Sequence, residues 1–216
     1  MRFLVTIIFF SCVSPLFSQT EKTYFQQQVN YNIAVKLDDK NHELTAFEKI
    51  TYTNNSPKQL TSLYFHLWPN AYKKYNSALG KQQLEDHNTK LYFAPDSILG
   101  FIDGLEFKVG DEKLQVEYAP YDEDVCIVYL LDPLKSGESV EITTPFHVKI
   151  PKGIFSRMGH LGESYQISQW YPKPAVYDKD GWHQMPYLDQ GEFYSEFGTF
   201  DVFITLPKNY VVGATG

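Results

Sequence analysis

Residues 29–37 read Val-Asn-Tyr-Asn-Ile-Ala-Val-Lys-Leu, and this stretch decides the fold class. Large apolar side chains alternate in it with polar or small ones, a period of two that predicts a half-buried β-strand. Residues 38–41 (Asp-Asp-Lys-Asn) then form a turn signal, and residues 44–52 are again rich in Phe, Ile, Thr and Tyr. Two such stretches joined by a short turn predict an antiparallel pair.

The same pattern continues along the chain. Further strands are predicted at residues 60–68, 104–109, 114–118, 125–131, 140–150, 165–170 and 200–206. Residues 69–97 interrupt the pattern and offer only short helical stretches, so we expect a long irregular insertion there. About nine or ten short strands separated by turns predict an all-β fold, an antiparallel β-sandwich formed by a single domain.

Composition agrees with this fold and excludes some functions. The 216 residues fit one domain of ordinary size, since domains average about 100–200 residues. Aromatic residues make up 16% of the chain, a content that suits β-structure better than a helical bundle. The net charge is −7 and no Lys/Arg cluster occurs, which argues against nucleic-acid binding because phosphate contacts need a basic surface.

The first residues resemble a targeting signal. Arg2 is the only charged residue before Glu21, and an apolar stretch follows it up to Phe10. A charged start, a short apolar run and a small residue before a polar boundary predict a signal peptide over residues 1–18, cleaved after Ser18. We therefore expect an exported protein without a stable membrane span, since a span needs about 20 apolar residues. A buried N-terminal strand or a signal anchor is the alternative.

The cysteines do not predict a disulfide framework. Cys12 lies within the expected signal peptide, where lipidation is an alternative although the preceding residues fit a lipidation site poorly. Cys126 lies in the apolar run Val-Cys-Ile-Val-Tyr-Leu (residues 125–130), so we expect a buried thiol that behaves as a small hydrophobic group.

No catalytic or metal-binding motif is present in this span. The chain lacks HExxH, CxxC, a phosphate-binding glycine-rich loop and GxSxG, and its six histidines are scattered. Residues 166–198 are instead dense in aromatic residues and proline, which predicts a rigid segment. We expect Trp182 and Tyr187 to be packing residues, and Asp189, Glu192 and Glu196 to be surface carboxylates rather than an acid–base pair.

Ser168-Gln169-Trp170-Tyr171-Pro172 resembles the Thr-Gln-x-Glu-Pro stretch in the N-terminal domain of M1-family zinc aminopeptidases (gluzincins), particularly exported bacterial members. Residues 186–190 (Pro-Tyr-Leu-Asp-Gln) resemble the family's Phe-Pro-Cys-Phe-Asp-Glu-Pro, and residues 199–207 resemble the strand that follows it. The resemblance implies a saddle-shaped β domain over residues 19–216. It also implies a chain truncated before the catalytic domain, which carries the GxMEN and HExxH motifs in that family.

The resemblance also implies a function and two site residues. The parent would be a metallopeptidase that hydrolyses peptides with zinc held by its catalytic domain, and this span alone would be non-catalytic. Gln169 would bind the N-terminal end of the peptide substrate, next to a catalytic domain contributed in cis. Tyr171 stands where many members have a glutamate for the α-amine, so strict aminopeptidase specificity does not follow: a neutral hydroxyl or a cation–π contact would replace the charge pair.

Two readings from other functional classes remain. Trp170, Tyr171, Tyr177 and Trp182 in an acidic, exported chain also suit a non-catalytic carbohydrate-binding β-sandwich, in which exposed rings stack on sugars. A structural or adhesive β domain is the other alternative, and it predicts no pocket near Gln169.

Overall fold

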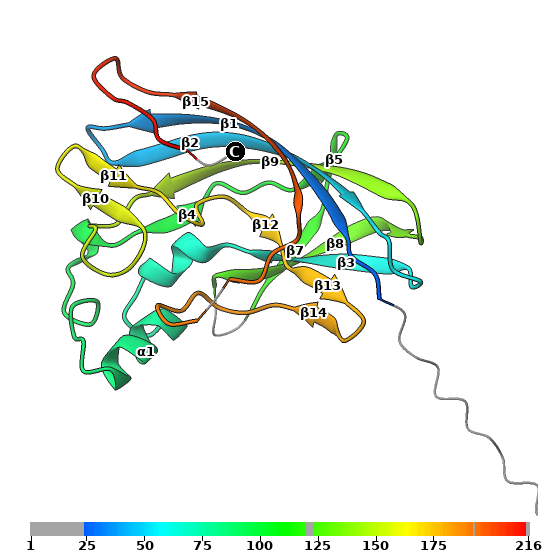
Figure 1. Cartoon of the computed structure of the whole chain (residues 1–216), viewed down its shortest axis with the longest axis horizontal. Coiled ribbons are helices and arrows are strands. Elements are labelled where there is room, and N and C mark those ends of the chain that lie inside the picture. Colours follow the sequence, from blue (N-terminus) through cyan, green and yellow to red (C-terminus); the bar gives the residue numbers. More distant parts are fainter. Residues whose placement is uncertain (1–23, 120–122, 192, 215–216) are drawn as a thin grey trace, which may run out of the picture.

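The computed structural model describes residues 24–119, 123–191 and 193–214 and confirms an all-β fold. A large curved sheet arches over a smaller sheet, and short helices lie beside the smaller sheet at one end of the molecule (Figure 1). The predicted signal peptide, residues 1–18, lies outside the described residues.

The large sheet is built around the hairpin that residues 29–52 predict. Its strands are β1 (Gln28–Asp38), β2 (Glu43–Thr53), β4 (Phe101–Asp103), β5 (Lys108–Val109), β6 (Glu112–Lys113), β9 (Ser139–Lys149) and β15 (Gly198–Thr205). They lie in the order β15-β1-β2-β9-β5-β6, and β4 also pairs with β9. β1 and β2 are antiparallel, with Tyr31 opposite Ile50.

One pairing in the large sheet departs from the antiparallel expectation. β15 runs parallel to β1, and Tyr31 lies opposite Phe200. Parallel neighbours cannot be joined by a tight turn, and here the rest of the domain forms the connection between them. Period-two patterns alone do not encode such a long-range pairing.

The smaller sheet contains β3 (Leu60–His66), β7 (Gln115–Tyr118), β8 (Val125–Leu134) and β12 (Lys173–Pro174), in the order β12-β3-β8-β7. Two hairpins complete the strands: β10 (Gly159–Leu161) with β11 (Ser164–Gln166), and β13 (Val176–Asp178) with β14 (Gly181–His183). The chain leaves the large sheet at Asn54, whose buried side-chain amide donates to Lys58 O (2.7 Å) and Leu134 O (2.9 Å). These bonds direct it into the smaller sheet.

The segment expected to be irregular contains short helices. They are the 3₁₀ helix η1 (Trp68–Tyr72), α1 (Ala78–Glu85) and the 3₁₀ helix η2 (Asp96–Ile98). Ser77 caps α1, since its Oγ accepts from Gly80 N at 3.1 Å. Among the described residues, no helix has the length and apolar character of a membrane span.

The alternating apolar residues of β1 and β2 form one wall of the core. Buried side chains on β1 are Val29, Tyr31, Ile33, Val35 and Leu37. From the smaller sheet Phe65 contacts Phe107 in the loop before β5, with ring centroids 4.8 Å apart. The core therefore lies between the two sheets, as expected for a sandwich.

Cys126 on β8 is fully buried, which confirms the expectation from its apolar run. Burial raises the pKa of its thiol to about 12, so the reactive thiolate is scarce at neutral pH. In a chain carrying Cys12→Ser, we expect a thiol reagent such as DTNB to modify Cys126 only after denaturation. Modification of the folded protein at the rate of a free thiol would contradict this assignment.

Candidate substrate-binding site

The segment that carries Gln169 and Tyr171 is fixed at both ends. Ser168 Oγ donates to Arg157 O at 3.0 Å. After Pro172 the chain forms β12 against β3, and Ala175 N donates to Tyr64 O at 2.8 Å. The residues between these anchors have a defined position without belonging to a long strand.

Gln169 adopts a left-handed backbone conformation, with φ of +54°. Residues with a Cβ cost about 1–2 kcal/mol in this region, and such strain concentrates at functional sites. Its side chain is half-buried, and Oε1 accepts a hydrogen bond from Lys173 Nζ. Among the described residues, Nε2 of Gln169 has no hydrogen-bond partner.

Lys173 is buried, with 4% of its surface exposed. Its ammonium nitrogen lies 3.9 Å from the centroid of the Trp68 ring and also donates to Ser195 Oγ at 3.0 Å. Burial lowers the pKa of Lys173 to about 7, because the charged form is poorly solvated there. Sequence reasoning missed this residue, since a lysine between two prolines gives no signal of burial.

His66 and Trp68 lie next to Lys173. Their rings stack with centroids 4.4 Å apart, and Trp68 Nε1 donates to Met185 O at 3.0 Å. Burial, with a smaller contribution from Lys173, lowers the pKa of His66 to about 3, so its imidazole is neutral. Its Nε2 accepts from Met185 N at 3.2 Å. The ring thus adds no second positive charge beside Lys173.

Tyr171 lies in different surroundings from Gln169. Its ring packs edge-on against Tyr31 and Phe200, with centroid distances of 5.5 and 6.1 Å. Burial, and to a smaller extent Glu48, raises the pKa of Tyr171, so its hydroxyl is neutral at physiological pH. The two predicted site residues are therefore neighbours in sequence that contact separate sets of side chains.

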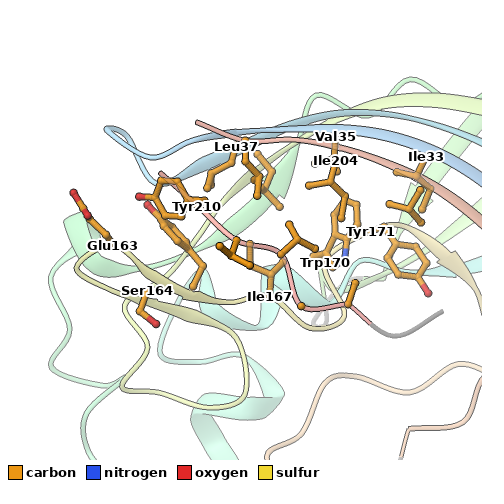
Figure 2. Close-up of a pocket in the computed structure, with 18 of the residues that line it drawn as sticks. Ile33, Val35, Leu37, Glu163, Ser164, Ile167, Trp170, Tyr171, Ile204 and Tyr210 are labelled. Carbon is orange, nitrogen blue, oxygen red and sulfur yellow. The ribbon is translucent and has the colours of Figure 1, made fainter. Parts of the chain in front are cut away.

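Tyr171 lines a groove of about 840 Å³ whose walls carry both apolar and polar side chains. Figure 2 shows its walls: Ile33, Val35 and Leu37 of β1 and Ile204 of β15 on one side, with Ile167, Trp170 and Tyr171 on the other. Gln169 is not part of the lining. The Gln169–Lys173 pair is thus separate from the groove.

Glu48 is a second residue that sequence reasoning missed. It lies on β2 between buried Ala46 and Ile50 and is 0% exposed. Neither carboxyl oxygen has a hydrogen-bond partner among the described residues, and burial raises its pKa well above the ordinary value. The alternation of residues 44–52 was the available signal, because it places position 48 on the apolar face of the strand.

The other aromatic candidates pack against the core. Trp170, Tyr177 and Trp182 are half-buried, and Tyr187 is 1% exposed, which agrees with a packing role for Trp182 and Tyr187. Trp170 also lines the groove, whereas Tyr177, Trp182 and Tyr187 do not. No observation therefore favours the sugar-binding alternative over the peptide-binding one.

The acidic candidates have separate partners. Asp189 accepts from Ser156 Oγ. Glu196 is half-buried and burial raises its pKa, so the expectation of a surface carboxylate is wrong for this residue. Glu192 lies outside the described residues. Across residues 24–119, 123–191 and 193–214, no group of three or more His, Cys, Asp or Glu side chains is arranged to hold a metal ion.

Comparison with known proteins gives a fold-level similarity. No protein-family model and no curated protein matches the chain. Among solved structures, an M1 zinc metallopeptidase from Deinococcus radiodurans is 11% identical over 87% of this chain and 33% of that chain, with a TM-score of 0.41. A mutant of this enzyme bound to a Tyr-Ser-Ala substrate is 11% identical over 85% of this chain and 33% of that chain, with a TM-score of 0.41.

A two-domain M1 zinc metallopeptidase mutant bound to L-arginine is 12% identical over 87% of this chain and 34% of that chain, again with a TM-score of 0.41. The chain spans about a third of the length of these proteins. At this level of identity the similarity concerns the fold alone.

Proposed function

We propose that this chain is the N-terminal, substrate-binding β domain of an exported, zinc-dependent M1-type metallopeptidase that hydrolyses peptides. The motif at residues 168–172 supports the assignment from the sequence. The observation that carries it is Gln169 itself: its backbone is strained, its Oε1 accepts from Lys173, and its Nε2 has no hydrogen-bond partner among the described residues.

The chain's own residues bind and orient the substrate in this proposal. Gln169 hydrogen-bonds the N-terminal end of the peptide, and the segment between Ser168 and Lys173 holds it in place. Tyr171 contributes a neutral hydroxyl and a ring face instead of a carboxylate, so this position offers no charge pair to an α-amine.

Zinc and the remaining chemistry belong to a catalytic domain contributed in cis. The described residues contain no cluster of metal-ligating side chains, so they do not form a zinc site. A catalytic zinc ion lowers the pKa of its bound water towards neutrality. Export by a signal peptide over residues 1–18 is part of the same proposal.

In the purified full-length protein, Gln169→Ala is expected to lower kcat/KM for peptide hydrolysis about tenfold, because one substrate hydrogen bond is lost. Steady-state kinetics on a fluorogenic peptide measure the change. Gln166→Ala is the matched control, since Gln166 is exposed on β11 of the same segment. Unchanged kinetics for a folded Gln169→Ala protein would contradict the binding role.

A core substitution separates stability from binding. Ile142→Ala on β9 removes a fully buried side chain and is expected to lower the midpoint of chemical denaturation while leaving kcat/KM of the folded fraction unchanged.

A further inference from the structure

The hydrogen bond between Lys173 and Gln169 fixes which end of the carboxamide faces outward. A lysine ammonium has three donors and no acceptor, and a carboxamide has one acceptor atom, so Oε1 faces Lys173 Nζ when the lysine is charged. The reverse orientation would place N–H groups against N–H groups. Nε2, which carries two donors, therefore points to the other side.

Lys173 is itself held in one position. The face of the Trp68 ring lies 3.9 Å from Nζ, and Ser195 Oγ accepts from the same atom at 3.0 Å. The negative face of an aromatic ring attracts an ammonium group, and more strongly where water is excluded. A buried, doubly anchored amine has little freedom to release Oε1, so the orientation of the Gln169 carboxamide is fixed before substrate arrives.

The Gln169–Lys173 pair itself disfavours a cationic ligand. Among the described residues, no carboxylate forms an ion pair with Lys173, and burial alone accounts for its altered pKa. An α-ammonium placed at Nε2 would meet a hydrogen-bond donor and, behind it, the amine of Lys173. A carbonyl oxygen placed there would meet a donor that has no other partner.

We propose that Lys173 is a positioning residue. It orients the Gln169 carboxamide so that Nε2 donates a hydrogen bond to an oxygen atom of the substrate. This site then prefers peptides whose α-nitrogen is acylated, by a blocking group or by preceding residues, over peptides with a free α-ammonium. The inference rests on the proposed function, in which Gln169 contacts the substrate.

The experiment compares two peptides of identical sequence, one with a free and one with an acetylated α-nitrogen. Steady-state kinetics of the purified full-length protein give kcat and KM for each. We expect a higher kcat/KM for the acetylated peptide, and we expect the ratio of the two values to fall about tenfold in Lys173→Met, which frees Oε1 and removes the buried amine.

Gln169→Glu provides a second variant, which retains the Lys173 side chain and pairs its amine with a carboxylate. It replaces the Nε2 donor by an oxygen, so the ratio is expected to fall in the same direction. Lys58→Met is the matched control, because Lys58 is exposed in the turn after β2, and it should leave the ratio unchanged. A lysine with a purely structural role would lower kcat/KM equally for both peptides and leave the ratio constant.

The outcomes separate this inference from the proposed function. Hydrolysis that is sensitive to Gln169→Ala, with a ratio that favours the free amine or stays constant in both Lys173→Met and Gln169→Glu, overturns the inference and leaves the proposed function in place. Absence of hydrolysis, or hydrolysis insensitive to Gln169→Ala, overturns both.

Discussion

Trp68→Ala is expected to lower the free energy of unfolding by about 3–5 kcal/mol, the range for removal of a large buried aromatic side chain. Trp68 is 1% exposed at the start of η1. Its ring contacts His66 and Phe193 with centroid distances of 4.4 and 4.7 Å, and its Nε1 donates to Met185 O at 3.0 Å. The substitution removes the packing and also leaves a carbonyl without its donor.

Chemical denaturation monitored by circular dichroism measures the loss. Trp182→Ala serves as a control, because Trp182 is half-buried on β14 and packs against Tyr64 and Tyr177 at the edge of the core. It should destabilise the protein less than Trp68→Ala does. Equal effects would contradict the central packing role of Trp68 against Met185 and Phe193.

The Trp68 substitution also reaches the candidate site. Removing the ring takes away the surface on which the Lys173 ammonium rests, so the Gln169 carboxamide loses its fixed orientation. Stability and substrate selectivity are therefore expected to change together in Trp68→Ala, whereas Ile142→Ala changes stability alone.

Glu48→Leu is expected to raise the free energy of unfolding by about 1–3 kcal/mol at neutral pH, because a buried polar group without a hydrogen bond costs about this much. Glu48 is fully buried without a hydrogen-bond partner among the described residues, so its carboxyl group costs free energy in the folded state. Leu at this position would continue the apolar face formed by Ala46 and Ile50. Equilibrium denaturation of both proteins measures the difference.

The same carboxyl group makes stability depend on pH. Below the ordinary pKa of 4.5, Glu48 is protonated in both the folded and the unfolded chain. As the pH rises from there towards the raised pKa of the folded state, the unfolded chain loses its proton first. The free energy of unfolding therefore falls with rising pH in this range. Denaturation at several pH values between about 5 and 7 should show a flatter pH dependence for Glu48→Gln than for the wild type.

Glu141→Leu is the control for both measurements. Glu141 is exposed on the adjacent strand β9 and forms a 3.2 Å ion pair with Lys49, an arrangement that contributes about 0–1 kcal/mol. Destabilisation by Glu48→Leu would show that the carboxyl group has a stabilising partner in solution.

Local patterns in the sequence determined the longest strands, whereas the strand predicted at residues 165–170 is only the short β11 (Ser164–Gln166). The alternation in residues 29–37 and 44–52 predicts β1, β2 and their antiparallel pairing, because side chains of a strand face opposite sides in turn. The buried position of Cys126 follows from its apolar run in the same way. The motif at residues 168–172 identified Gln169 and Tyr171, although nothing in the motif indicates what either side chain contacts.

Only the tertiary structure decided the long-range arrangement. The parallel pairing of β15 with β1 and the contact of Lys173 with Trp68 join residues far apart in sequence, and no local period encodes such a contact. The orientation of the Gln169 carboxamide follows from a hydrogen bond whose donor becomes fixed only when Lys173 is buried between the sheet and η1. The sequence by itself therefore determined the class of fold and the candidate residues, while burial and packing determined their charge, orientation and partners.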